Sequence, residues 1–565
     1  MSRRSSLPPL EPGAVRKPWA DRVAVALVYP NTYRVAMGSL AFHQVYHLIN
    51  LRDEFVCERV TLPDTGAPRS VESGRPLTDF EIIAVSISYE EDALNLARML
   101  LAAGVPLTAA ERDRRNSPLV LAGGVIAFLN PEPIAPFCDL VAVGEAEAIL
   151  PGLLDGYLER RHSPREELLP ALARLPGVYV PSLYKIDYAD DGAIAGRRPL
   201  ATAPERVAHL IAPPQREPAC SHIYGGVAAE FGDLMLIELG RGCPHGCRFC
   251  AGSYLYRPPR WTPAEAVAAA LAGRPAGLHR AGLMAATVTA HPEFDRIRAE
   301  LARIDMPYSL ASLRLDEVTP DLLAEMVGGG AKSVTLAPEA GSERLRRIIN
   351  KDLSDEQVEA AMAAIGAAGI RRVKLYFQVG LPGETAEDIE ACTFLLRRIQ
   401  IALARGAAGR NWLPQVTVSA NPFVPKPATP FQWAAMADAT TLRDRLAALK
   451  KAAGRAGMTF GGSPISASLF QAWVSRGDRR TAAALALAAG QGLDGRRVMR
   501  LAVPGLPPPD WYLHRERPRD EVLAWDFITH GCDKDYLWIE GERAAAGKLT
   551  PSCRPGECKR CAACG

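Results

Sequence analysis

The sequence predicts an α/β protein in which a doubly wound domain precedes a partial parallel barrel. Two long stretches of the chain alternate short β-rich runs with helical stretches, which is the pattern of parallel sheets covered by helices. At 565 residues the chain is too long for one hydrophobic core, so two large domains with smaller appendages are expected.

The composition limits which binding partners and which cellular compartment are expected. Lys and Arg number 66 against 63 Asp and Glu, so the net charge of +3 does not indicate nucleic acid as a partner. Residues 1–20 lack the continuous apolar stretch of a secretory signal and are predicted to be a disordered tail. No apolar run of about 18 residues occurs in the sequence, so no membrane-spanning helix is expected. We therefore expect a soluble, cytoplasmic protein without a membrane partner.

Residues 21–160 are predicted to form the doubly wound, Rossmann-like domain. Its strand-like runs are RVAVALVYP, IIAVSIS, LVLAGG and LVAVGE, with helices expected over residues 38–50 and from Glu90 onward. Ligands bind at the loops that follow the carboxyl ends of strands in open α/β sheets. The turn residues at these positions are Ser88, Gly123, Gly124 and Gly144.

The remaining chain divides into four parts. Residues 161–225 are a connecting segment with a hairpin near residues 187–191. Residues 226–440 contain six strand-like runs with helices between them and are predicted to form a partial (β/α)6 barrel, in which chemistry sits on the loops after the strands. Residues 441–529 are predicted to be a helical appendage, and residues 530–565 a cysteine-rich module.

Cysteines are unevenly placed along the chain. Of the twelve, Cys243, Cys247 and Cys250 form a C-x3-C-x2-C triplet directly after the first barrel strand. Such clustering favours metal binding over disulfides. Three thiolates on a 4Fe-4S cluster leave one iron open to a small molecule. A zinc site completed by His245 or Cys220 and three inert buried thiols are the alternatives.

The triplet, its position and Phe249 before the last cysteine resemble the signature of the radical SAM superfamily. The stretches LAPEAGSERLRRIINK and VKLYFQVGLPGET resemble the fourth and fifth strands of that family's barrel with their loops. The resemblance implies that Cys243, Cys247 and Cys250 are catalytic and hold a 4Fe-4S cluster. Its open iron would bind S-adenosylmethionine (SAM), and reductive cleavage would give methionine and a 5′-deoxyadenosyl radical. An electron donor such as flavodoxin or ferredoxin is implied as a partner.

The resemblance also assigns SAM-binding residues, which are Phe249, Thr287, Thr289, Glu339, Ser342, Gly380 and Leu381. Phe249, Gly380 and Leu381 would lie near the adenine of SAM. Glu339 and Ser342 would lie near its ribose or methionine part, and Thr287 and Thr289 near its amino group. A Gly-Gly-Glu turn that the family often has at the threonines is absent. Two plainer interpretations stay open: Glu339 as an acid at a helix N-terminus, and the GLPGE stretch as a simple turn.

A doubly wound domain in front of this barrel resembles the cobalamin-binding subgroup of the superfamily, and residues 123–150 are similar to its last strands. The resemblance places cobalamin near Ser86, Ser88, Gly123, Gly124 and Gly144. A D-x-H-x-x-G loop, which supplies a histidine to cobalt in many cobalamin proteins, is missing, so coordination by a protein histidine is not expected. Cobalamin, another small ligand and a structural platform remain three interpretations of the domain.

The last residues, CRPGECKRCAACG, place four thiols within twelve residues: Cys553, Cys558, Cys561 and Cys564. Cys532 lies about twenty residues upstream and is counted with these four as a candidate metal ligand. A second iron-sulfur cluster or an all-thiolate zinc site fits this ligand count, and an unstructured tail is the third interpretation. The stretch resembles the radical SAM subgroup that has both a cobalamin-type domain and a cysteine-rich tail.

The leading functional hypothesis is a radical SAM enzyme that performs methyl transfer or cyclisation on a substrate the sequence does not define. The first alternative is a methylthiotransferase-like enzyme that modifies RNA or protein. Such enzymes keep a cysteine-rich domain in front of the barrel, where this chain has only Cys57 and Cys138, which counts against it. The second alternative is a non-enzymatic metal-binding protein on the same scaffold.

Overall fold

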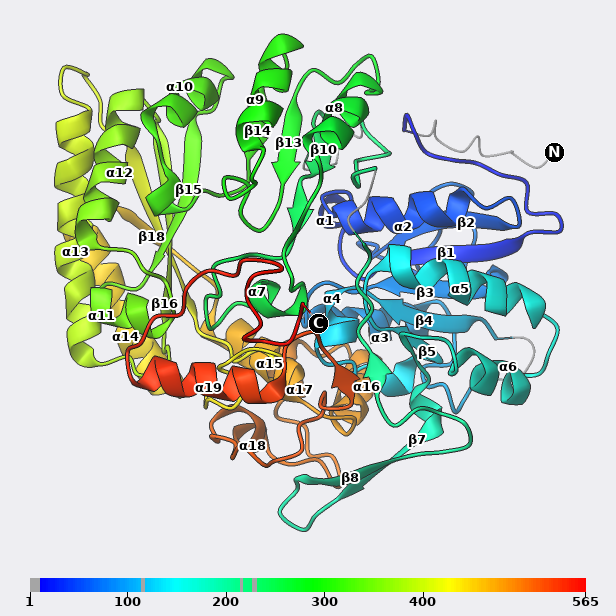
Figure 1. The fold of residues 1–565 in the computed structure, drawn as a ribbon. Helices are drawn as coiled ribbons and strands as arrows, with labels where there is room; N and C mark the ends of the chain where they lie inside the picture. The colour runs from blue at the N-terminus through cyan, green and yellow to red at the C-terminus, as the bar shows by residue number, and fades with distance from the viewer. Residues whose placement is uncertain (1–10, 113–116, 214–216, 226–230, 565) are drawn as a thin grey trace.

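The computed structural model describes residues 11–112, 117–213, 217–225 and 231–564. Two α/β bodies lie beside one another, with the helices that follow the second body and the C-terminal segment beneath them (Figure 1). Within the described residues no helix is long and apolar enough to cross a membrane.

The first body is a six-stranded sheet in the order β2-β1-β3-β4-β5-β6, parallel except for the last pair. Its strands are β1 (Val23–Tyr29), β2 (Phe55–Thr61), β3 (Ile82–Ser86), β4 (Leu119–Gly123), β5 (Leu140–Ala142) and β6 (Val178–Tyr179). Helices α2 (Leu40–Asn50), α3 (Asp92–Ala102) and α5 (Ala146–Glu159) flank it. The doubly wound prediction is confirmed, and the order of the first five strands places the topological switch point between β1 and β3.

Strand β2 was not predicted, because charged residues stand at its centre. The side chains of Arg59 and Glu72 are both fully buried and pair at 2.6 Å. The neighbouring Glu58 accepts a hydrogen bond from the indole nitrogen of Trp19 at 2.8 Å. The charges that break the apolar pattern are therefore compensated inside the fold.

The N-terminal segment departs from the prediction of a disordered tail. Residues 1–10 lie outside the described residues, but residues 11–20 pack on the first sheet. The ammonium group of Lys17 donates to the carbonyl oxygens of Asn50 and Arg52 at 2.6 and 2.8 Å. The segment is irregular, yet its basic side chains satisfy backbone carbonyls of neighbouring loops, which holds it in place.

The connecting segment contains the predicted hairpin, formed by β7 (Tyr184–Tyr188) and β8 (Ile194–Pro199). It also contributes α6 (Arg165–Leu172) and the edge strand β6 to the first body. Further on, β9 (Val207–Ala208) pairs in parallel with β19 (Ile528–Thr529), so this segment joins the C-terminal part of the chain.

The second body is an open parallel barrel. One sheet contains β10 (Met235–Glu238), β13 (Ala281–Met284) and β14 (Tyr308–Leu310); the other contains β15 (Ser333–Glu339), β16 (Arg372–Val379), β17 (Gln415–Pro422) and β18 (Thr459–Gly461). A parallel bridge between Leu313 and Leu336 connects the two sheets. The six predicted strands are present, and β18 extends the barrel into residues that were predicted to belong to the helical appendage.

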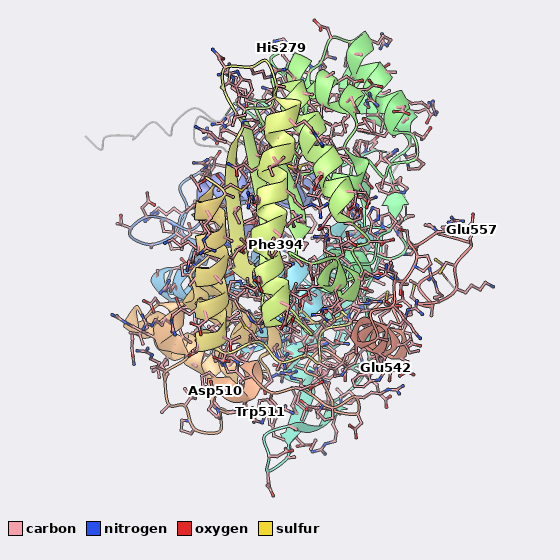
Figure 2. The ribbon with its side chains drawn as sticks, turned by 90° about the vertical axis from the view of Figure 1, so that its left-hand side faces the viewer. His279, Phe394, Asp510, Trp511, Glu542 and Glu557 are labelled. Carbon is pink, nitrogen blue, oxygen red and sulfur yellow. The ribbon has the colours of Figure 1, made fainter. Side chains whose placement is uncertain are left out.

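Helices cover the outside of this barrel. They are α8 (Ala264–Ala272), α9 (Phe294–Arg303), α10 (Pro320–Gly328), α12 (Asp355–Ala368), α13 (Ala386–Gly406) and α14 (Ala439–Arg455). Figure 2 shows α13 on the outer surface, where the Phe394 side chain is 63% exposed. The carboxyl ends of the barrel strands face the centre of the molecule, towards the first body and the C-terminal segment (Figure 1).

The later helices connect the two bodies. They are α15 (Ile465–Arg476), α16 (Thr481–Gln491), α17 (Gly495–Val498), α18 (Pro509–Leu513) and α19 (Lys534–Ala545). At this junction the fully buried carboxylate of Glu132 pairs with Arg197 at 2.9 Å and Arg479 at 3.0 Å, and accepts from the Tyr179 hydroxyl at 2.6 Å. Burial alone would raise the pKa of Glu132, but the two guanidinium charges hold it at about 2.

We expect Glu132→Ala to lower the free energy of unfolding by about 3 to 5 kcal/mol, because it removes the buried carboxylate that neutralises the largely buried guanidinium groups of Arg197 and Arg479. The wild-type carboxylate has a depressed pKa, so its contribution is complete above its ordinary value of 4.5 and is lost as the pH falls towards 2. Denaturant unfolding at pH 7 and pH 3 measures both effects. In the control Glu159→Ala, which removes an exposed carboxylate, stability should change by less than about 0.5 kcal/mol. An equal loss of unfolding free energy in Glu132→Ala and Glu159→Ala would contradict the stabilising role of the Glu132 carboxylate.

Candidate active site

The three-cysteine loop lies between β11 (Gly240–Arg241) and α7 (Gly252–Leu255), just beyond the first barrel strand. Cys243 and Cys247 are buried, whereas Cys250 is half-buried. Gly242 has a φ of +84°, and a side-chain Cβ there would lie 2.5 Å from the carbonyl oxygen of Tyr256. A glycine is therefore required for the tight path that brings the three thiols together.

Arg248 fixes the loop to the neighbouring segments of the chain. Its side chain is fully buried and donates to the carbonyl oxygens of Ile348 at 2.8 Å and Lys548 at 2.6 Å. The same guanidinium pairs with Glu540 on α19 at 3.1 Å. One side chain thus joins the cysteine loop to the end of α11 (Glu343–Ile348) and to the C-terminal segment.

Asn350 fixes the loop from the other side. Its amide nitrogen donates to the carbonyl oxygens of His245 and Gly246, both at 3.1 Å, and its amide oxygen accepts from the backbone of Thr550 at 2.8 Å. Its φ of +58° is a conformation that asparagine adopts more readily than most residues. The buried amide of Asn350 therefore satisfies two of the carbonyls between the first two cysteines, and the Tyr254 hydroxyl also donates to that of Gly246 at 2.9 Å.

Charged residues connect the loop to the first body. Arg241, two residues before Cys243, pairs with Glu145 at 2.9 Å and with Glu147 at 2.7 Å, and both acids follow β5. Arg260 also pairs with Glu145. The position of the loop relative to the first sheet is thus held by a buried ion-pair network.

The predicted threonines lie next to the cysteines. The Thr287 hydroxyl oxygen is 3.4 Å from the Cys243 sulfur. Thr289 donates to Glu317, which also pairs with the His245 ring at 3.2 Å. Glu317 was not predicted, and it places a carboxylate beside the loop where the family's usual acidic turn is absent.

Glu339 ends β15 with a φ of +70° and makes two polar contacts. Gln378 donates to one carboxylate oxygen at 3.0 Å, and Lys351 lies 3.4 Å from the other. The helix that follows begins only at Glu343, so Glu339 is not in its first turn. The helix-terminus interpretation of Glu339 is therefore wrong.

Ser342 has a structural role that the sequence did not assign to it. Its hydroxyl oxygen is the N-cap of α11 and accepts from the Leu345 amide at 3.0 Å, and it also bonds to Asp388. Both interactions account for the serine in this position. Its contact with SAM stays a prediction.

Phe249 and Leu381 are brought together. Phe249 packs against one apolar cluster, whose buried members are Ala340, Leu345, Ile348, Ile349, Leu381, Phe423, Phe431 and Ala544. Gly380, at the end of β16, has a φ of +81°, and its amide donates to the Glu384 carboxylate at 2.9 Å. The GLPGE stretch is thus a glycine turn, as one interpretation held, and the same turn places Leu381 in the cluster with Phe249.

Two cations near Cys247 were missed as site residues. Burial raises the pKa of the Cys247 thiol to about 12, while the charges of Lys351 and Arg314 act in the opposite direction. Arg314 pairs with Asp316 at 2.8 Å. Lys351 ends the LAPEAGSERLRRIINK stretch, so its place in that motif was the available signal.

A cavity of about 460 Å³ separates the first sheet from the cysteine loop. All the residues predicted for a ligand on the first domain line it, namely Ser86, Ser88, Gly123, Gly124 and Gly144. Gly240, Arg241, Gly242 and Tyr256 form the opposite wall. The cavity therefore lies at the carboxyl ends of the strands, as an α/β sheet predicts, and it borders the loop that carries the three cysteines.

All twelve cysteines are free thiols. Among the residues that the structure describes, no group of three or more His, Cys, Asp and Glu side chains has the compact geometry that a single metal ion requires. A 4Fe-4S cluster distributes its thiolate ligands over separate iron atoms and does not need that compact arrangement.

Family models match both bodies of the chain. Residues 41–181 match the model for the N-terminal part of radical SAM proteins, and residues 237–396 match the model for the radical SAM superfamily. The chain belongs to the radical SAM superfamily. It is accordingly an enzyme, and the second match covers the radical SAM barrel from β10 to α13.

Two relatives are similar in sequence. The chain is 28% identical over 426 residues to the uncharacterized protein MJ0966 of Methanocaldococcus jannaschii, covering 72% of this chain and 79% of the relative. It is 27% identical over 191 residues to the tRNA-2-methylthio-N(6)-dimethylallyladenosine synthase of Sorangium cellulosum, covering 29% and 38% of the two chains.

Among solved structures, the cobalamin-dependent S-adenosylmethionine radical enzyme OxsB with bound aqua-cobalamin matches with 15% identity and a TM-score of 0.45. The match covers 67% of this chain and 52% of OxsB, so the chain spans about half the length of that protein. The coproporphyrinogen III oxidase HemN from Escherichia coli matches with 17% identity and a TM-score of 0.29, covering 39% and 52% of the two chains.

We expect Asn350→Ala to weaken iron binding by the three-cysteine loop by about 10- to 100-fold, because the His245 carbonyl loses its Asn350 donor and the Gly246 carbonyl keeps only the Tyr254 hydroxyl. Iron release to a chelator from the anaerobically reconstituted protein measures this effect. Asn95→Ala is the control, since Asn95 also donates to a backbone carbonyl, that of Pro30, but in the first body. Equal release rates for wild type and Asn350→Ala would contradict the proposed support.

Proposed function

We propose that this enzyme binds a 4Fe-4S cluster through Cys243, Cys247 and Cys250 and cleaves SAM reductively to a 5′-deoxyadenosyl radical. The observation that carries the proposal is the three-thiol loop at the mouth of the barrel, with two buried cysteines and a half-buried third. Its donor set fits an iron-sulfur cluster, and Gly242 leaves no room for a side chain in the turn. A bound cluster supplies the electron that breaks the carbon–sulfur bond of SAM.

Different residues around the loop would bind different parts of SAM. Phe249 and Leu381 offer an apolar surface for the adenine, since both belong to one cluster beside the loop. Glu339, already hydrogen-bonded by Gln378, presents its carboxylate at the end of β15 for the ribose or the methionine part. Thr287 and Glu317 place polar groups beside the loop for the amino group of SAM.

Water and oxygen must be kept from the radical, and the fold supplies this protection. The C-terminal segment packs on the cysteine loop through Arg248 and Asn350, and the first body covers it through Arg241. The electron is delivered by a one-electron donor of the flavodoxin or ferredoxin class.

In the anaerobically reconstituted wild type supplied with SAM and dithionite, we expect 5′-deoxyadenosine to form, and in Cys243→Ala we expect none. Removing one thiolate leaves only two protein ligands for the cluster, so the site that binds SAM is lost. Liquid chromatography of the nucleoside, together with iron analysis, checks both. Cys220→Ala, which removes a free cysteine whose thiol donates to the Pro218 carbonyl, should retain activity. Absence of cleavage by a fully loaded wild-type cluster would leave the metal-binding interpretation instead.

We further propose that the cavity between the two bodies binds cobalamin and that the reaction is methyl transfer to an unactivated carbon. Support comes from the position of the cavity, at the β1/β3 switch point and against the cysteine loop. Most side chains that line it are apolar, including Leu27, Leu121, Val125 and Phe128, and such a surface suits a broad macrocycle. Bound cobalamin would supply the methyl group beside the site where the substrate radical forms.

Filling the cavity tests this assignment. We expect Val125→Trp, which introduces a large ring into the lining, to weaken binding of hydroxocobalamin by at least about tenfold, and Val125→Ala to bind it as well as wild type. Absorbance of the corrin retained after desalting measures binding. SAM cleavage by the three-cysteine cluster should survive in both variants. Equal retention by the Trp variant would place cobalamin elsewhere, and no retention by wild type would leave the other-ligand and platform interpretations.

The relative from Sorangium cellulosum favours a second candidate function. That relative is named as a tRNA-2-methylthio-N(6)-dimethylallyladenosine synthase, so the addition of a methylthio group to RNA is the alternative reaction. The first body gives no support for the front cysteine site of such enzymes, because Cys57 and Cys138 are both fully buried in its apolar core. Mass spectrometry of RNA incubated with the enzyme separates a gain of a methyl group from a gain of a methylthio group.

A further inference from the structure

The C-terminal cysteines lie against the cysteine loop of the barrel. The Cys553 amide donates to the carbonyl oxygen of Pro244, the residue after Cys243, at 2.7 Å. The Cys532 thiol donates to the carbonyl oxygen of Tyr254 at 3.5 Å. Figure 1 shows the C-terminal segment passing in front of α7, which follows the loop. The same loop that carries the first three thiols therefore positions the tail.

We propose that Cys553, Cys558, Cys561 and Cys564 hold a second 4Fe-4S cluster, and that this cluster passes electrons to the one on the three-cysteine loop. This inference rests on the proposed function and deepens it, since it names the route by which the reductant reaches the SAM site.

The four thiols share one small region. Arg560 donates to the Cys558 sulfur at 3.1 Å and to the carbonyl oxygen of Pro551, two residues before Cys553, at 3.0 Å, so the tail folds back on itself. The C-x4-C-x2-C-x2-C spacing matches the ligand count of one cluster. Positive φ values at Gly556 (+81°) and Ala562 (+60°) let the short chain reverse between its cysteines, so four sulfurs can surround one centre.

Cys532 is placed as a partner of the site rather than as one of its ligands. Its thiol donates its one proton to the Tyr254 carbonyl, and Cys532 packs with Cys561 and Tyr254 in one buried cluster. In this role Cys532 is a neutral thiol beside a ligand cysteine, whereas a ligand would be a thiolate. Cys532 was among the candidate metal ligands expected from the sequence, and the proposed cluster does not use it.

Arg257 lies between the two groups of cysteines. A Cβ on Gly246 would be 2.9 Å from its guanidinium, which therefore touches the first loop. On the other side its charge acts on Cys561 and Cys553, and it donates to the Tyr536 hydroxyl at 3.1 Å. Its one positive charge compensates part of the negative charge that four thiolates bring to a cluster.

The two groups differ in their access to solvent, which gives the electron a direction. Cys558 and Cys564 are half-buried, and Cys558 stands between the exposed residues Glu557 and Lys559, whereas every residue from Gly242 to Cys250 is buried or half-buried. Figure 2 shows Glu557, next to Cys558, at the edge of the molecule. A one-electron donor can reach this edge, and the Cys553–Pro244 hydrogen bond leads from the tail to Cys243. Each cleavage oxidises the donor by one electron and reduces one SAM, and the tail cluster returns to its starting state.

The test compares Cys561→Ser with two control variants, Cys532→Ser and Cys220→Ser. Each full-length protein is reconstituted anaerobically, and iron, zinc and sulfide are measured. We expect Cys561→Ser to lose about half of the iron, whereas both controls keep it, because a serine hydroxyl can still donate to a carbonyl. SAM cleavage is then measured with dithionite and, separately, with flavodoxin and its reductase. Cys561→Ser should lose more than about tenfold with flavodoxin and less than about twofold with dithionite.

Zinc in the wild-type tail, or equal activity of wild type and Cys561→Ser with flavodoxin, would overturn the relay. Loss of iron in Cys532→Ser comparable to that in Cys561→Ser would overturn the ligand assignment. Failure of the proposed function looks different, because wild type with both sites loaded would then cleave no SAM with either reductant.

Discussion

The structure depends on holding a short, irregular cysteine loop whose own backbone forms few regular hydrogen bonds. A loop in which Gly242 and Gly246 take positive φ values gains little from secondary structure, so its carbonyls must find donors elsewhere. Asn350, the Tyr254 hydroxyl and the Cys553 amide supply these donors. Arg248 adds an anchor in the opposite direction, since it donates from the loop to the carbonyl oxygen of Lys548. The hydrogen bonds of the loop are therefore complete only when the C-terminal segment has folded onto it.

This constraint explains why both the first body and the C-terminal segment contact the region of the cysteine loop. Arg241 binds acids of the first body, while Arg257 contacts Tyr536 of α19. Each arginine leaves the loop in a different direction and ends on a different part of the fold. Bidentate or multiply bonded guanidinium groups fix orientation better than apolar contacts do, so the loop has little freedom to move relative to either neighbour.

The sequence predicted the regular elements well and the supporting contacts poorly. The six barrel strands and four strands of the first sheet follow from their β-branched runs, and the cavity residues follow from the rule that ligands bind after strands. Strand β2 was not predicted because Glu58 and Arg59 interrupt its apolar pattern. Their partners, Trp19 and Glu72, come from other segments of the chain. Periodicity reports which side chains are apolar, but it carries no information about long-range partners of buried charges.

The same distinction applies at the site. Spacing alone identified the three cysteines, because their chemistry is local to eight residues. Glu317 and Asn350 could not be found in this way, since each acquires its role from contacts with segments that are distant in sequence. The position of the C-terminal cysteines next to Pro244 also depends on long-range contacts, because it requires α19 to dock against the barrel. Because assembly of the loop and docking of the tail use the same contacts, the two groups of cysteines are structurally linked.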